Sequence, residues 1–133
     1  MTDIEQAHEF FKQDIFAIDT CGIKITKVGE ISECQMPIKA KHLNALNSVM
    51  GGAIFTLADF TLAVALNYNN IPSVTTSANI NFLSNAKGKT LIAQARPIRK
   101  GRTLSCYQVD VYDELNTHVA FLTMNGFRVS DTY

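Results

Sequence analysis

One apolar stretch in the middle of the chain decides the fold, Met50-Gly51-Gly52-Ala53-Ile54-Phe55-Thr56-Leu57-Ala58-Asp59-Phe60-Thr61-Leu62-Ala63-Val64-Ala65-Leu66-Asn67. Apolar side chains fall on nearly every side of the helix that this stretch would form, a pattern typical of a helix buried on most sides. Ile71-Pro72 follows and ends it. The stretch therefore predicts a central helix that other elements of the chain must cover.

The segments on either side of this helix predict a sheet. After it come four extended runs, at about 73–83, 89–99, 103–113 and 118–129, rich in β-branched and aromatic residues and separated by turn residues. Before it, 23–28 and 33–38 predict a hairpin of two short strands, and 39–49 predicts a loop. Pro97 indicates that its strand is an edge or carries a bulge at that point.

The N-terminal segment has apolar residues at helical spacing, which predicts one amphipathic helix over 3–18 that ends near Cys21-Gly22. The predicted order is helix, two strands, long helix, four strands. One antiparallel sheet wrapped around a single helix is the simplest arrangement that buries that helix, and this α+β architecture is the hotdog fold. A chain of 133 residues without a linker is expected to form a single domain over 1–133.

Charge narrows the range of partners. The formal net charge is zero, which gives no reason to expect nucleic acid or a membrane surface as partner. The low share of charged residues indicates that part of the surface is hidden against another subunit. A stretch without any acid nevertheless contains six cations, Lys87, Lys89, Arg96, Arg99, Lys100 and Arg102. It is interpreted either as a solvated sheet edge or as a site for a polyanionic small molecule such as a nucleotide.

Three cysteines, Cys21, Cys34 and Cys106, are widely spaced and predict buried or half-buried thiols in a reducing compartment. The N-terminus shows no signal-peptide pattern, and no apolar run reaches the roughly 18 residues of a membrane span. A cytoplasmic protein is expected. Histidines and cysteines lack ligand spacing, so no metal site is predicted.

Asp59 is the only acidic residue between Cys34 and Val109, and it lies within the most apolar helix. Burial costs a carboxylate its hydration. Desolvated, isolated carboxylates serve as general bases and nucleophiles, so Asp59 is the first candidate for catalysis. The alternative is that Asp59 only binds neighbouring backbone and holds the core together.

Gly51 and Gly52 begin the same helix, where the first-turn N–H groups have no intrahelical acceptor and favour negative charge. A carbonyl that develops oxyanion character would suit that position. The alternative is that the glycines allow close packing of the helix end. Gly51 and Asp59 stand eight residues apart, about 12 Å along a helix. If both act on one carbonyl, they must come from two subunits, which predicts an obligate dimer with active sites at the interface.

Residues 42–59 closely resemble the signature of the phenylacetate-degradation (PaaI-type) thioesterases, which typically reads H-x-N-x-x-G-x-x-H-G-G followed by a T-L-x-D helix. The chain reads His42-Leu43-Asn44-Ala45-Leu46-Asn47-Ser48-Val49-Met50-Gly51-Gly52, and then Thr56-Leu57-Ala58-Asp59. Further similar segments continue to about residue 129. The resemblance implies a hotdog acyl-CoA thioesterase that forms the free acid and coenzyme A without a cofactor, as a homodimer that pairs into a tetramer.

The same resemblance implies a role for each matching residue. Asp59 would activate water or attack the thioester carbon, and the Gly51 amide of the partner subunit would polarise the carbonyl. Asn44 would position the carbonyl or the water, and Thr75 would assist the aspartate. Gly52 and Met50 would border the substrate, and the acyl group would lie against central-helix side chains. Contacts to the coenzyme A phosphates would come from Arg99, Lys100, Gly101 and Arg102.

Two departures from the family pattern stand in the signature. Met50 replaces the H-G-G histidine, and Asn47 replaces the glycine three residues before it. Methionine cannot relay a proton, so the reaction is slower or another group substitutes. This keeps open a non-catalytic acyl-CoA-binding or regulatory protein of the same fold. A hotdog hydratase is disfavoured, because no Asp–His pair occurs near Asp59, and both His42 and His118 are expected at the solvent surface.

Overall fold

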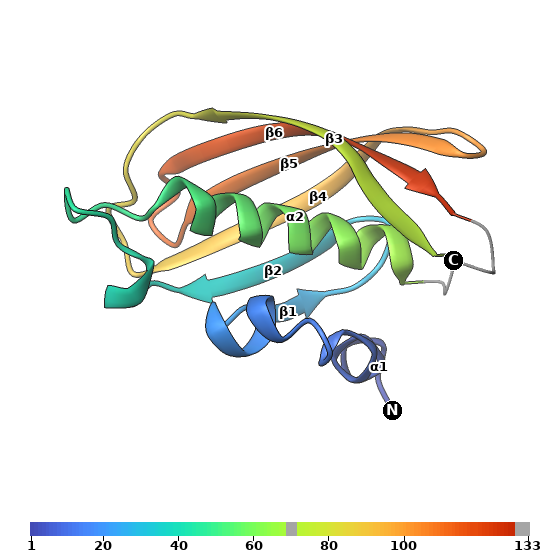
Figure 1. Cartoon of the computed structure of the whole chain (residues 1–133), viewed down its shortest axis with the longest axis horizontal. Helices are drawn as coiled ribbons and strands as arrows, with labels where there is room; N and C mark the ends of the chain where they lie inside the picture. The colour runs from blue at the N-terminus through green and yellow to red at the C-terminus, as the bar shows by residue number, and fades with distance from the viewer. Residues whose placement is uncertain (69–71, 130–133) are drawn as a thin grey trace.

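The structure is a computed structural model that describes residues 1–68 and 72–129. The long helix α2 (Gly51–Asn67) lies along one face of a six-stranded sheet that curves around it (Figure 1). All neighbouring strands are antiparallel, in the order β1-β2-β4-β5-β6-β3. The strands are β1 (Lys24–Lys27), β2 (Ser32–Pro37), β3 (Ser73–Phe82), β4 (Thr90–Lys100), β5 (Leu104–Asp113) and β6 (His118–Arg128). This is the predicted α+β hotdog architecture, with every strand within one or two residues of its expected range.

The core forms where α2 packs on the inner face of the sheet. Leu57, Leu62 and Val64 of α2 are completely buried. On the sheet, buried residues recur at every second position, as in Leu91, Ala93 and Ala95 of β4 and in Tyr107, Val109 and Val111 of β5. This period of two is the pattern of strands with one buried face. The apolar stretch that predicted a central helix is therefore the element that the sheet covers.

The strand β3 is an edge of the sheet, since it pairs with β6 alone. Its residues Thr76–Asn79 are exposed. From Val74 to Phe82, an edge of this kind presents backbone groups to which another strand can bind, whereas the backbone of Ser73 is bonded to the Asn67 side chain.

Pro97 lies within the sheet, and both of its predicted consequences occur. The pairing of β4 with β2 ends at Ala95, so beyond that residue β4 has only β5 as neighbour. A register shift between Pro97 and Arg99 forms the bulge. Proline lacks the N–H group that a strand paired on both sides would need.

A single helix over 3–18 is wrong. The helix α1 (Asp3–Phe11) is followed by a turn, in which the N–H of Asp14 donates to the carbonyl oxygen of Phe11, and then by one π-helical turn, η1 (Phe16–Thr20). Phe11 and Ala17 are both buried. At about 100° per residue, a straight helix would place them on faces about 120° apart, so the chain must bend to bury both. The bend brings residues 14–17 beside α2.

Candidate active site

The start of α2 leaves two amides without an acceptor. Met50 is the N-cap residue, and its side chain makes no capping hydrogen bond. The carbonyl oxygen of Met50 accepts from the N–H groups of Ala53 and Ile54. Within residues 1–68 and 72–129, neither Gly51 nor Gly52 donates its N–H to any acceptor. These two groups therefore remain available to an anion or a carbonyl oxygen at the helix terminus.

Of the two glycines at the start of α2, Gly51 is the one that allows close packing of the helix end. A Cβ atom on Gly51 would lie 3.0 Å from the ring of Phe82 on β3, whereas a Cβ on Gly52 would meet nothing within 4 Å. Gly51 thus allows the close approach of Phe82, and it also carries one of the two free amides. Packing and carbonyl recognition are compatible at this position.

Asn44 shares a cavity of about 430 Å³ with Gly51, Ile54, Phe82 and neighbouring residues. The Oδ1 atom of Asn44 accepts from the N–H groups of Leu46 (2.9 Å) and Ser48 (3.1 Å), which fixes the side chain. No acceptor for its Nδ2 atom is found within the described residues. The amide group is therefore held in place with its N–H donors free, close to the amides of α2.

The backbone explains the departure at Asn47. Asn47 has φ = 65°, in the left-handed region, and its N–H donates to the carbonyl oxygen of Asn44. Glycine and asparagine are the residues that adopt this conformation most readily. Asparagine thus preserves the turn that glycine forms in the family pattern.

Asp59 lies half-buried on the outer face of α2 and is bonded to β3. The Oγ1 atom of Thr75 donates to Oδ1 of Asp59 at 2.9 Å. A register shift between Thr75 and Ser77 disrupts the regular pairing of β3 with β6 just beyond this residue. Bulges of this kind redirect a side chain next to a site. Thr75 is therefore placed to orient the carboxylate.

Sequence reasoning missed a second carboxylate, that of Asp14. It lines a cavity of about 300 Å³ together with Asp59, Thr56, Phe60 and residues 15–17. Burial, and then the negative charge of Asp59, raise the pKa of Asp14 above its ordinary value. The bend after Phe11 puts Asp14 there, and no local pattern in the sequence signals that bend.

The four predicted catalytic residues thus form two separate pairs. Asn44 and Gly51 share one cavity, while Asp59 and Thr75 are joined by a hydrogen bond. The eight residues between Gly51 and Asp59 span about 12 Å of α2. One small carbonyl group cannot contact both pairs within a single chain.

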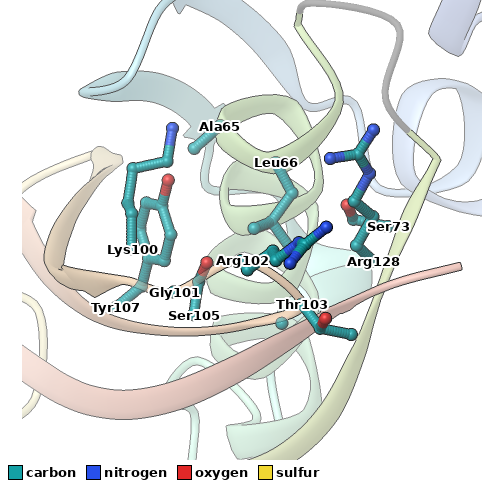
Figure 2. A pocket seen from close by; sticks show the side chains of 11 residues that line it. Ala65, Leu66, Ser73, Lys100, Gly101, Arg102, Thr103, Ser105, Tyr107 and Arg128 are labelled. Atoms are coloured by element: carbon teal, nitrogen blue, oxygen red, sulfur yellow. The ribbon is translucent and has the colours of Figure 1, made fainter.

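Three of the four predicted phosphate-binding residues, Lys100, Gly101 and Arg102, border a small cavity of about 90 Å³ at the C-terminal end of α2. Figure 2 shows the side chains of Lys100, Arg102, Tyr107 and Arg128 arranged around this end of the helix. Within the described part of the chain, no acidic side chain lies within 4 Å of the Arg102 or Arg128 guanidinium groups. Lys100 makes only a surface pair with Glu30, at 3.6 Å. We call this cavity, lined by Lys100, Gly101, Arg102, Tyr107 and Arg128 among others, the basic cavity.

Tyr107 adds an unsatisfied donor to the basic cavity. Its side chain is 0 % exposed, and its hydroxyl has no hydrogen-bond partner among the residues that the structure describes. Burial, followed by the negative charge of Glu30, raises the pKa of Tyr107 to about 12. A neutral hydroxyl that lacks a partner in a basic cavity is suited to an anionic ligand.

The acid-free stretch of sequence divides in space. Lys100, Gly101 and Arg102 line the basic cavity, whereas Arg99 does not. Arg96 lies 3.8 Å from Asp110 on the neighbouring strand and belongs to a surface ion pair. Gly101 closes the turn between β4 and β5, where a Cβ would lie 2.3 Å from the carbonyl oxygen of Leu104. Arg128 and Tyr107 belong to the cavity but were not predicted, since they are distant in sequence.

The expectation that both histidines are solvent-exposed is wrong for His42. It is buried, its Nδ1 atom accepts from the N–H of Lys39, and its Nε2 atom lies 2.8 Å from the carbonyl oxygen of Cys21. This bonding assigns the proton to Nε2 and ties the loop before α2 to the core. His118 is half-buried, stacks on Tyr112 and lies 3.1 Å from Asp110.

Two kinds of feature are absent from residues 1–68 and 72–129. No helix there is long and apolar enough to cross a membrane. No three or more His, Cys, Asp or Glu side chains there are grouped so that they could hold a metal ion.

Comparison with known proteins decides the family. Residues 46–120, more than half of the chain, match the Thioesterase superfamily. The chain belongs to this superfamily. As a member of the Thioesterase superfamily it is a thioester hydrolase by class, and the matched range includes Gly51, Asp59, Thr75 and the turn between β4 and β5.

Individual members of the superfamily extend the similarity to almost the whole chain. The acyl-coenzyme A thioesterase PaaI of Escherichia coli is 28% identical over 130 residues, 96% of this chain and 92% of that protein. Its solved structure superimposes with a TM-score of 0.87 at 24% identity, over 96% of this chain and 94% of the other. The resemblance to PaaI-type thioesterases and the hotdog fold are therefore confirmed.

Two further relatives bear on the ligand. Mouse acyl-coenzyme A thioesterase 13 is 32% identical over 94 residues, 66% of this chain and 67% of that protein. A Streptococcus mutans protein was solved bound to acetyl CoA. It is 26% identical, with a TM-score of 0.75 over 81% of this chain and 89% of the other.

Proposed function

We propose that this thioesterase hydrolyses acyl-CoA to the free acid and coenzyme A as a homodimer. Each active site would combine Asp59 and Thr75 of one subunit with Gly51 and Asn44 of the partner subunit. The observation that carries the proposal is the separation of these residues into two pairs along α2, each bordering a cavity. The names of the relatives, two of them acyl-coenzyme A thioesterases, support the substrate class.

The edge strand β3 supports the dimer. From Val74 to Phe82 it has no partner strand on the side away from β6 among the described residues, and apolar side chains near the start of α2 are exposed, among them Leu46, Met50 and Phe82. A two-fold contact along this edge would satisfy the backbone groups of both copies and bury these side chains. Such a contact would also bring the Gly51 end of one subunit toward Asp59 of the other. The pairing of two dimers into a tetramer stays a prediction.

The chemistry follows from the two pairs. Asp59, oriented by Thr75, takes a proton from water as the water oxygen bonds to the thioester carbon, or its own oxygen attacks that carbon. The carbonyl electrons move to oxygen, where the Gly51 N–H and the Asn44 Nδ2 group donate hydrogen bonds. The intermediate then expels the coenzyme A sulfur, which takes up the proton that Asp59 received from water. If Asp59 itself attacks, the sulfur takes its proton from solvent, and a water molecule then hydrolyses the acyl-aspartyl anhydride, which releases the free acid and restores the carboxylate. Met50 has no part in these steps, since two fixed donors orient the carbonyl.

The phosphate groups of coenzyme A are assigned to the basic cavity. Arg102 and Arg128 offer guanidinium groups that have no acidic partner within residues 1–68 and 72–129, Lys100 adds a third cation, and the Tyr107 hydroxyl adds a neutral donor. Charge-assisted hydrogen bonds to phosphate are the strongest contacts that such side chains make. The structure of the Streptococcus mutans relative with acetyl CoA supports a ligand of this class.

Thiol release from a panel of acyl-CoAs tests the proposal. The wild type should turn over at least one member, without added cofactor and unaffected by a chelator. Asp59→Asn should lower kcat by about 10³-fold or more while its circular dichroism is unchanged. If the protein binds acyl-CoAs but hydrolyses none of them, it is instead the non-catalytic acyl-CoA-binding protein. The replacement of the family histidine by Met50 leaves that alternative open.

The phosphate assignment is tested separately. Combined Arg102→Gln and Arg128→Gln substitution should raise the KM for acyl-CoA about tenfold or more with little change in kcat. Arg99→Gln serves as the matched control, because Arg99 lies in the same stretch but outside the basic cavity. An equal effect of the control would show that general surface charge, not the cavity, attracts the substrate.

A further inference from the structure

A groove runs along the outer face of α2, between this helix and the N-terminal segment. Its first part is the cavity of about 300 Å³ that contains Asp59, Phe16 and Phe60. Its second part is a cavity of about 350 Å³ that contains Phe10, Val74 and Val129. Asp14 and Ala63 line both cavities, so the two adjoin. We call the pair of cavities the α2 groove.

We propose that the α2 groove holds the acyl chain of the substrate, and that the enzyme prefers neutral, apolar acyl groups long enough to pass Ala63. The inference rests on the proposed function, because it takes Asp59 as the residue beside the reacting carbonyl. From Asp59 to Asn67, the last α2 residue that lines the groove, the helix rises by about 12 Å. A chain that starts at Asp59 can therefore extend well beyond a short acyl group.

The charge of the α2 groove differs from that of the basic cavity. Among the described residues, the only ionisable side chains that line the groove are Asp14 and Asp59, and no lysine or arginine lines it. Lys100, Arg102 and Arg128 line the basic cavity, which shares only Ser73 with the groove. The groove therefore suits an uncharged part of the substrate, and the basic cavity suits its phosphates.

The two acidic side chains of the groove also exclude an acyl group that ends in a carboxylate. A terminal carboxylate in the groove would face two acidic side chains without a cation. Burial, and then the negative charge of Asp59, raise the pKa of Asp14, so a second negative charge beside Asp59 is already disfavoured in the groove.

The walls of the groove present apolar surface that the subunit leaves uncovered. Phe10 and Phe16 are 59 % and 63 % exposed, and Ile15 is exposed to a similar extent. Apolar side chains grouped around a cavity mark a binding site rather than scattered surface residues. All three of these exposed side chains come from residues 10–17, outside the range 46–120 that matches the superfamily. The expectation that central-helix side chains line the acyl pocket therefore accounts for only one wall.

A series of acyl-CoAs of increasing chain length, assayed with the wild type and with a variant whose groove is filled, tests the inference. For the wild type, kcat/KM should rise from acetyl- to hexanoyl- to decanoyl-CoA, by up to about fourfold for each methylene buried. Ala63→Phe should fill the junction of the two cavities, so that decanoyl-CoA loses about tenfold or more while acetyl-CoA stays within about twofold of wild type. Butanoyl-CoA should exceed succinyl-CoA, which has the same chain length and a terminal charge.

Phe16→Ala provides a variant that does not threaten folding. It should lower kcat/KM for decanoyl-CoA by a factor several times larger than the factor for acetyl-CoA. Leu115→Ala is the matched control, since Leu115 is equally exposed at 63 % but lies on the turn between β5 and β6. Equal losses in both variants would contradict a specific role of the groove.

The outcomes separate this inference from the proposed function. Hydrolysis that is independent of chain length would overturn the groove assignment and leave the thioesterase intact. If Ala63→Phe alters the oligomeric state on size exclusion but not the chain-length preference, the groove is a contact between subunits instead of an acyl site. If no acyl-CoA is hydrolysed, calorimetry still decides, because decanoyl-CoA must bind wild type more tightly than coenzyme A does and lose that advantage in Ala63→Phe.

Discussion

At the scale of the residue, the hydrogen bond between Thr75 and Asp59 gives the sharpest prediction. Thr75→Val keeps the shape of the side chain and removes the donor to Asp59 Oδ1. A hydrogen bond to a charged group contributes about 1.5 to 3 kcal/mol, so kcat should fall by about 10- to 100-fold with KM little changed. Thr75→Ser restores the hydroxyl and should recover most of the rate. A serine variant as slow as the valine variant would mean that packing on β3, not the hydroxyl, matters.

Single residues were predictable where their own neighbours in sequence make them unusual. Asp59 was found because a lone carboxylate stands among apolar residues of one helix. Asp14 was not, because a charged residue in an amphipathic segment is unremarkable until the bend after Phe11 turns it toward Asp59. Arg128 and Tyr107 reach the basic cavity only through the pairing of β5 with β6. Contacts of that kind depend on register, which local patterns do not define.

At the scale of the element, the loop between β3 and β4 depends on Asp113 at the end of β5. This side chain is 1 % exposed and accepts four backbone hydrogen bonds, from Lys87, Gly88, Leu115 and Thr117. Burial raises the pKa of Asp113, but the N–H groups of Lys87, Thr117 and Gly88 outweigh it and hold the pKa well below its ordinary value. The carboxylate therefore joins the 87–88 turn to the hairpin of β5 and β6.

Asp113→Asn should lower the free energy of unfolding at pH 7 by about 2 to 3 kcal/mol, because an amide cannot accept from all four donors. Since the folded-state pKa is lowered, this contribution is complete above the ordinary aspartate pKa of about 4 and is lost as pH falls below it. Denaturant unfolding at pH 7 and pH 3 should therefore show a larger difference between variant and wild type at pH 7. Asp19→Asn, exposed on η1, is the control. A difference that grows on acidification would contradict the assignment.

Periodicity predicted the regular elements and failed at the N-terminus. The strands and α2 are long, and their apolar patterns agree with the face that each buries. The segment 3–18 also has helical periodicity, yet it bends because Phe11 and Ala17 pack against the body of the protein from different angles. Tertiary packing outweighs a local preference there, and this bend supplies one wall of the α2 groove.

At the scale of the whole molecule, the cysteine thiols can serve as probes of local unfolding. Cys21 and Cys34 are buried and Cys106 is half-buried, as predicted, and burial raises the pKa of Cys34 to about 12. A thiol reagent at pH 8 should modify Cys106 first and Cys34 only after unfolding. Peptide mapping of the labelled protein, folded and in denaturant, measures this order. Rapid labelling of Cys34 in the folded protein would indicate that the contact between α2 and β2 opens readily.

The proposed active site between two subunits makes the strongest prediction about the assembly. Asp59→Asn removes the carboxylate, and Asn44→Asp keeps the Oδ1 acceptor of the 44–48 turn while it removes the Nδ2 donor. Each variant alone should be inactive. In a mixed dimer, one site carries both changes and the other carries neither. Random exchange of equal amounts places half of the subunit pairs in mixed dimers, so activity should return to about a quarter of wild type.

The recovery of activity in the mixture depends on whether Asp59 and Asn44 of one active site come from two chains or from the same chain. If each active site used Asp59 and Asn44 of the same chain, every site in the mixture would carry one damaging change, and activity would stay at the level of the separate variants. Co-expression with two different tags, followed by purification on both, isolates the mixed dimer, whose activity should then be about half of wild type. Because about 12 Å of α2 separate Gly51 from Asp59, only the shared arrangement brings the carboxylate and the carbonyl donors to one thioester.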